Sequence, residues 1–168
     1  MESGQDFRIP RAIADGLSEA ELYWAVIEPI WPDIHVKDEL AHIARGTPGQ
    51  RAIYATTLFA REVDNGGLAQ FFSNSSGMYT KHVEEGLHLL GAHELLKTFL
   101  DAQRLFPGSA APIDTELRRR LVDEALSGDR NVLEPFDQRL LRGSNVEAQL
   151  YPYFKTYIDT HPAEFFLD

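Results

Sequence analysis

Apolar residues recur along most of this chain with helical rather than alternating spacing, as Ile53, Leu58, Phe59 and Val63 illustrate. Alternation of apolar and polar residues never continues beyond four positions, so the pattern predicts no strand. Glycine and proline separate the helical stretches by short connections. The sequence therefore predicts an all-α fold, a single compact domain of about seven to nine helices with antiparallel neighbours and short loops.

Capping residues mark several of the expected helix starts. Ser18 precedes Glu21 at the spacing of a capping box, so a helix is expected from this serine to about Trp31. Thr47 followed by Pro48 is a second start signal, with threonine as the cap and proline at the first helical position. Further helices are expected over residues 37–44, 47–65, 68–73, 79–90, 92–106, 114–126, 131–142 and 146–160, followed by a terminal turn at 162–166.

The chain divides into residues 1–16, expected to be a loose N-terminal lead-in, and residues 17–168, expected to form the helical domain. The lead-in lacks the apolar core of a secretory signal, and no apolar run approaches the length of a membrane span. The absence of cysteine excludes disulfides and thiolate metal sites. These features predict a cytoplasmic protein without a membrane partner.

Charge supplies the first indication of function. The sequence holds 26 acidic and 16 basic residues, a formal net charge of −10, so direct nucleic-acid binding is not expected. Residues 15–39 are the most acidic stretch, with Lys37 as their single base, whereas elsewhere acids are interleaved with arginines at 118–120, 139 and 142. This stretch is either a solvated, helix-capping face or a binding surface for a basic protein. The candidate partner-binding residues are Glu19, Glu21, Glu28, Asp33, Asp38 and Glu39.

The most distinctive stretch runs from Glu62 to Gly77 and reads EVDNGGLAQFFSNSSG. The preceding helix is expected to stop at Gly66, which would supply the left-handed conformation of a helix end. Phe71 and Phe72 are expected to anchor the following short helix in the core. The polar side chains either satisfy backbone groups freed at this corner or line a small polar pocket. The candidate pocket residues are Glu62, Asn65, Gly66, Gly67, Gln70 and Asn74.

This stretch resembles the signature of the family of the neisserial DNA-mimic protein, which runs Glu-Val-Asn-Asn-Gly-Gly-Phe-x-Gln-Phe-Phe-x-Asn-Ser-x-Gly. The chain departs from that signature at Asp64, where the family tends to have Asn, and at Leu68, where it tends to have Phe. The resemblance extends from about Leu17 to Phe166. Further matches are Leu89-Leu90-Gly91-Ala92, Phe106-Pro107, Asp137, Tyr157-Ile158, Pro162 and Phe165.

The resemblance implies a helical domain of a family whose members mostly have no assigned function. The member that gives the family its name is an acidic helical protein that resembles DNA in its charge layout, binds a transcription factor and blocks it from DNA. Such mimicry depends on where carboxylates lie and not on a shared glycine corner. The resemblance therefore does not by itself extend DNA mimicry to this chain.

Catalytic and metal-binding motifs offer little support for an enzyme. Glu84 and His88 are four positions apart on one expected helical face, but His-Glu-x-x-His is absent. The sequence also lacks the Gly-x-Ser-x-Gly nucleophile motif and a phosphate-binding loop. We therefore expect no catalytic residues, no metal and no cofactor.

Two interpretations of function remain open. The first is a non-enzymatic acidic binding module that engages a basic protein, such as a transcription factor, through a carboxylate-rich face. The second is a small-ligand or enzymatic pocket at residues 62–77. The first requires carboxylates clustered on one exposed face, and the second requires Glu62, Asn65, Gln70 and Asn74 to converge on an open cleft.

Overall fold

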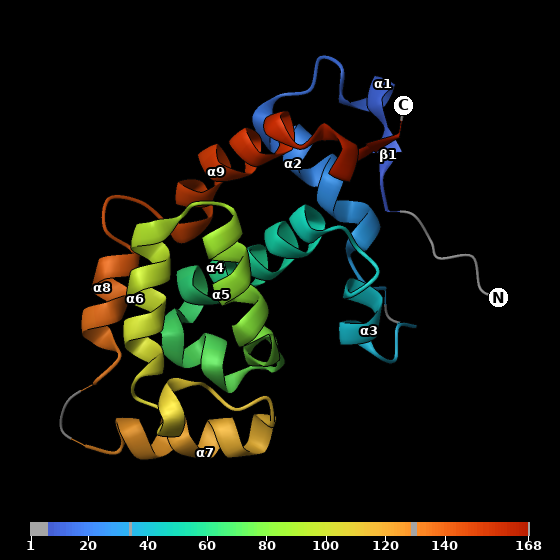
Figure 1. Ribbon diagram of the computed structural model, residues 1–168. Coiled ribbons are helices and arrows are strands. Elements are labelled where there is room, and N and C mark those ends of the chain that lie inside the picture. Colours follow the sequence, from blue (N-terminus) through green and yellow to red (C-terminus); the bar gives the residue numbers. More distant parts are fainter. Residues whose placement is uncertain (1–6, 34, 129–130, 168) are drawn as a thin grey trace.

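Helices form most of the chain in the computed structural model, which describes residues 7–33, 35–128 and 131–167 (Figure 1). The α-helices of these residues are α1 (Arg11–Ala14), α2 (Glu19–Ile27), α3 (Glu39–Ile43), α4 (Pro48–Ser73), α5 (Thr80–Leu89), α6 (His93–Gln103), α7 (Thr115–Leu126), α8 (Glu134–Leu140) and α9 (Val146–Thr160). Short 3-10 helices are η1 (Glu28–Ile30), η2 (Ser75–Tyr79), η3 (Pro107–Ser109) and η4 (Pro162–Glu164), and the strands are β1 (Ile9–Pro10) and β2 (Phe166–Leu167). The all-α prediction is confirmed.

The long helix α4 lies at the centre of the molecule, with α2, α5, α7, α8 and α9 packed around it (Figure 1). Its start follows the sequence signal, because the Thr47 hydroxyl accepts from the Gln50 amide while the Gln50 side chain accepts from the Thr47 amide. Pro48 occupies the first helical position, where its missing N–H leaves no backbone donor unsatisfied.

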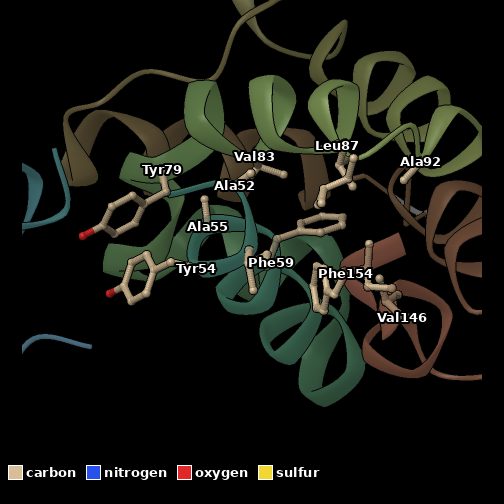
Figure 2. Packing of buried hydrophobic residues seen from close by; sticks show 14 of the residues in the cluster. Ala52, Tyr54, Ala55, Phe59, Tyr79, Val83, Leu87, Ala92, Val146 and Phe154 are labelled. Atoms are coloured by element: carbon tan, nitrogen blue, oxygen red, sulfur yellow. The ribbon is translucent and has the colours of Figure 1, made fainter. Parts of the chain in front are cut away.

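Aromatic and aliphatic side chains fill the space between α4 and its neighbours. Figure 2 shows Tyr54 and Phe59 of α4 facing Tyr79, Val83 and Leu87 of η2 and α5, and all five are at most 2% exposed. Each fully buried side chain of this size contributes about 1.5–3 kcal/mol through removal of apolar surface from water. The core thus supplies the driving force that helix propensity alone does not.

Helix α2 lies beside α9, and both pack on α4 (Figure 1). The Tyr23 ring stacks on Phe154 of α9, with ring centroids 5.4 Å apart, and its hydroxyl donates to Thr57 of α4 over 2.9 Å. Burial raises the pKa of Tyr23, so this phenol stays protonated. The start of α2 is the predicted capping box of Ser18 and Glu21.

The segment expected to be a loose lead-in is partly docked. Strand β1 pairs in parallel with β2, the Ile9 amide donates to the Phe165 carbonyl over 3.0 Å, and Phe7 is 3% exposed. Residues 7–10 thus lie against the helical domain, while residues 1–6 lie outside the described residues. Strands of two residues carry no alternation signal, so this pairing cannot be predicted from the sequence.

Candidate functional site

The glycine corner is a sharp kink within α4, near the predicted helix end. Gly66 has a φ of −152°, which any residue adopts, whereas Gly67 has a φ of +71°. The prediction that Gly66 takes the left-handed conformation is therefore wrong, and Gly67 takes that role. A Cβ at Gly67 would also lie 2.6 Å from a carboxylate oxygen of Asp137. Two requirements, backbone conformation and close approach, thus converge on Gly67.

The kink leaves backbone amides without a partner inside the helix, and a carboxylate of α8 accepts a hydrogen bond from one of them. The Leu68 amide donates to Asp137 over 2.8 Å, which ties the second half of α4 to α8. Burial raises the pKa of Asp137, although the Leu68 amide opposes that shift. Asp137 was identified in the sequence only as a family match, and the structure assigns it this bond to the corner.

Glu62 is the hub of the polar side chains at the corner. Its Oε2 accepts from the side-chain Nε2 of Gln70 over 2.6 Å and from the side-chain Nδ2 of Asn74 over 2.9 Å. Its Oε1 accepts from the Ser76 hydroxyl over 2.7 Å. Asn65 joins the network, because its side-chain Nδ2 donates to the side-chain Oε1 of Gln70 over 3.0 Å. These bonds connect the two halves of the kinked helix to η2.

The predicted pocket residues therefore contact one another. Glu62, Gln70 and Asn74 are half-buried, and the carboxylate of Glu62 uses both oxygens within the cluster. The three cavities described for this molecule are lined by residues outside the cluster. This arrangement is what a hydrogen-bonded structural corner requires, since each polar group has a protein partner.

Asp64, where the chain departs from the family signature, has a structural partner on α9. Its carboxylate accepts from the amides of Val146 over 2.6 Å and Glu147 over 3.0 Å, while Asn145 caps the same helix through the Ala148 amide. A carboxylate is favourable at this position because the first amides of a helix are unsatisfied and carry partial positive charge. Asp64 thus joins α4 to the start of α9.

Arg118 of α7 is the residue that sequence reasoning missed. It was grouped with surface arginines, yet its side chain is fully buried. The guanidinium donates to the carbonyls of Phe72 and Asn74 at the end of α4, and to those of Pro112 and Ile113 before α7. Burial lowers its pKa, whereas the four carbonyl oxygens favour the charged guanidinium.

Gly77, the last residue of the signature, provides the space for Arg118. A Cβ at this glycine would lie 2.3 Å from the Nε of Arg118. The spacing of the signature therefore fits a structural origin at both ends: Glu62 organises its start and Gly77 admits the buried guanidinium. Gly77 has no positive φ, so the close approach of Arg118 accounts for this glycine, and the sequence alone does not display that approach.

The six candidate partner-binding carboxylates are all exposed on α2, η1, α3 and their connections. Three of them accept local hydrogen bonds, Glu21 from Ser18, Asp33 from the His35 amide and Asp38 from the Ala41 amide, and Glu39 accepts a long-range one from the Tyr79 hydroxyl. Glu19 and Glu28 make none within the described residues. Capping therefore accounts for part of this acidic stretch.

The ion pairs between described residues lie on other parts of the surface. None of the six carboxylates forms an ion pair with a described lysine or arginine. The acids that do pair lie on α5, α6, α7 and α9: Glu85 with Lys81, Asp101 with Arg104 and Arg139, Glu116 with Arg119, Glu124 with Arg120, Glu147 with Arg61, and Asp159 with Lys155. Exposed acids without an ion pair to a described residue also occur singly on α5, α6, α7 and α8, at Glu84, Glu94, Asp123 and Glu134, whereas residues 19–39 hold six of them close together in sequence.

Metal ligation receives no support from the described side chains. Glu39 with His42, and Glu85 with His88, show the Glu-x-x-His spacing of di-metal bundles. The described residues nevertheless hold no group of three or more His, Asp or Glu that could bind a metal. His42 instead contacts the Ile30 carbonyl through its Nε2 atom. His82 lines the same cavity as Glu85 and His88, and burial lowers the pKa of its imidazole.

Comparison with known proteins places the chain in a family without supplying a characterised relative. No helix in the described part is both long and apolar enough to cross a bilayer. Neither the curated proteins nor the solved structures contain a match to this sequence. The model of the family described as DMP19-like protein matches residues 44–161, which include the glycine corner, Arg118 and Asp137. The chain belongs to the DMP19-like protein family.

Proposed function

We propose that this protein is a non-enzymatic binding module that engages a basic, DNA-binding protein through the carboxylates of residues 15–39. The observation that carries this proposal is the number of unpaired carboxylates gathered in one stretch of the chain. Six exposed acids of α2, η1, α3 and their connections have no ion-pair partner among the described residues, whereas other unpaired acids are dispersed over α5, α6, α7 and α8. Membership of a family named for a DNA mimic supports a DNA-binding protein as the partner.

The arrangement of α2 supports an outward-facing carboxylate stripe. Glu21, Trp24 and Glu28 are exposed and follow one another at intervals of three and four, while Tyr23 and Val26 are buried. At a rise of about 1.5 Å per residue, the two glutamates lie about 10 Å apart along the helix axis. Arg61 of α4 lies against Trp24 at this face, and its Nε lies 3.7 Å from a carboxylate oxygen of Glu147.

The size of the acidic surface limits what it imitates. A DNA duplex carries one negative charge per about 1.7 Å of axis, so six carboxylates match the charge of about 10 Å of duplex. A surface of this size would contact one basic patch and not a whole DNA-binding face. Electrostatic steering of that patch would mainly raise the association rate.

The test compares two triple charge reversals of the full chain. Glu19→Lys, Glu28→Lys and Asp33→Lys alter the proposed surface, while the control reverses Glu116, Asp123 and Glu124 to Lys, which are exposed on α7. Immobilised wild-type and control proteins should retain a DNA-binding protein from native-cell extract, and the first variant should lose it. The retained protein should elute with salt, because charges more than about 8 Å apart are screened at physiological ionic strength.

Competition with duplex DNA completes the test, because a protein held through its DNA-binding surface should be released by added duplex. Equal retention by wild type and the first triple variant would refute the acidic surface. Retention that resists both salt and duplex would refute the charge mechanism. We do not propose a ligand site at Glu62, since its oxygens accept hydrogen bonds from Gln70, Asn74 and Ser76.

A further inference from the structure

A groove of about 570 Å³ lies within the acidic surface, between α2, the segment after η1, and α4. Its volume is in the range of pockets that enclose a small ligand or a large side chain. It contains both tryptophans of the sequence, and Trp24 is 41% exposed. The lining residues are Trp24, Glu28, Trp31, Pro32, Asp33 and Arg61.

Arg61 holds the two indole rings in place. Its guanidinium carbon lies 4.7 Å from the ring centroid of Trp24 and 5.3 Å from that of Trp31. Its Nε lies 3.7 Å from a carboxylate oxygen of Glu147, which anchors the arginine to α9. These contacts fix the aromatic walls before any partner arrives, and preordered side chains lose little conformational freedom on binding.

The charge of the groove favours a cation. Glu147 compensates Arg61, whereas Glu28 and Asp33 have no cationic partner within the described residues. Asp33 uses one oxygen to accept from the His35 amide over 2.7 Å, and the carboxylate of Glu28 accepts no hydrogen bond from the described residues. Two exposed carboxylates therefore flank indole faces at the rim of an apolar hollow.

We propose that this groove is the anchor site for an arginine side chain of the basic partner. The aliphatic stem packs against Pro32 and Trp31, the guanidinium plane stacks on Trp24, and its N–H groups donate to Glu28 and Asp33. This inference rests on the proposed function and names the side chain that the acidic surface receives. Exposed tryptophans at the centre of a charged surface are typical of binding hot spots.

Arginine fits this groove better than lysine for a geometric reason. A planar guanidinium stacks on an indole face while presenting several N–H donors in its plane to carboxylates, whereas an ammonium is a compact, strongly hydrated point charge. A diffuse acidic surface would attract both cations equally. Discrimination between arginine and lysine therefore separates a built site from general electrostatic attraction.

Intrinsic fluorescence provides a direct measurement, because both tryptophans of the chain line the groove. Acetylated, amidated octa-arginine and octalysine peptides are titrated into the full-length protein at about 0.15 M salt, the ionic strength at which distant charges are screened. We expect octa-arginine to change the tryptophan emission and to bind about tenfold more tightly than octalysine, a difference of about 1.4 kcal/mol.

Neutral isosteric variants locate the site. Glu28→Gln with Asp33→Asn should weaken octa-arginine binding about tenfold, and Trp24→Leu should abolish the preference for arginine. Glu116→Gln with Glu124→Gln, on α7, is the control with the same change in charge and should bind octa-arginine like the wild type. Thermal melts of all variants check that these exposed substitutions leave the fold intact.

Three outcomes would overturn the inference. Equal affinity for the two cationic peptides, or equal losses in the α2 and α7 pairs of variants, would show that attraction is diffuse. A response to octaglutamate in place of octa-arginine would assign the groove to an anion held by Arg61. If the peptides are not discriminated but the triple reversal still abolishes capture of the DNA-binding protein, the anchor fails and the proposed function survives. If capture is unaffected by the reversal, the proposed function itself fails.

Discussion

Replacing Arg118 by methionine should lower the free energy of unfolding by about 3 kcal/mol. The side chain is fully buried, and no described carboxylate pairs with it. Its guanidinium donates to four backbone carbonyls over distances of 2.5 to 2.9 Å. Two of those carbonyls belong to the end of α4 and two to the segment before α7. One side chain therefore joins the end of α4 to the segment before α7.

The magnitude follows from two opposing terms. Hydrogen bonds to a charged donor contribute about 1.5–3 kcal/mol each, so four of them contribute about 6–12 kcal/mol. Burial of the cation removes several kcal/mol of that gain through loss of hydration. Methionine fills a similar space but leaves the carbonyls of Phe72, Asn74, Pro112 and Ile113 without this donor. The net loss is then about 3 kcal/mol, a large part of the 5–15 kcal/mol that typically stabilises a domain.

Urea unfolding measures this loss. With an m-value of about 2 kcal/mol/M, the midpoint should fall by about 1.5 M at unchanged slope. Arg118→Lys keeps the charge but offers a single ammonium, so its midpoint should lie between those of methionine and wild type. Arg120→Met is the control, since Arg120 is exposed and its Nε lies 3.9 Å from Glu124. A midpoint for Arg118→Met within about 0.3 M of the control would refute the role of the guanidinium.

Four further substitutions test the glycine corner and its supports by urea unfolding. Gly67→Ala should cost at least about 2 kcal/mol, because Gly67 combines a positive φ with the nearby Asp137 carboxylate; an unchanged midpoint would contradict this. Asp64→Asn should cost about 1 kcal/mol, since an amide offers one oxygen where the carboxylate accepts from two helix amides. Glu62→Gln should cost about 2 kcal/mol, because the three donors around it then meet an amide; a stable variant would indicate a free carboxylate. Asp137→Asn should gain stability relative to wild type as pH rises from 4 to 7, because a carboxyl with a raised pKa loses stabilisation as pH rises through that pKa; a flat difference would refute the shift.

Local signals in the sequence predicted the helices well. Ser18, Thr47 and Asp114 all accept hydrogen bonds from amides in the first turns of α2, α4 and α7. Such caps depend on neighbours within about four residues, so a sequence displays them directly. The start of α8 was placed too early, because Asn131 accepts from the Leu133 amide in a turn before the helix.

Long-range contacts account for what the sequence did not reveal. The choice between Gly66 and Gly67 as the left-handed residue depends on Asp137, which is about 70 positions away along the chain and approaches Gly67. The burial of Arg118 depends in the same way on carbonyls of α4 and on the space left by Gly77. An arginine within the sequence Arg118-Arg119-Arg120 has the appearance of a solvated residue, and tertiary packing alone distinguishes it from its neighbours.

The match to the family and most of the proposed binding surface cover different parts of the chain. The match to the family covers residues 44–161, and within it the signature residues between Glu62 and Gly77 bond to each other, to Asp137 and to Arg118. Residues 15–39, with the unpaired carboxylates and both tryptophans, precede the matched range, and Arg61 is the groove residue that lies inside it. A scaffold held by buried polar bonds tolerates changes on an exposed helix such as α2, because those side chains contribute little to the core. Relatives that keep the glycine corner are therefore expected to share this fold, whereas the partner they bind follows from the side chains on the surface equivalent to α2 and η1.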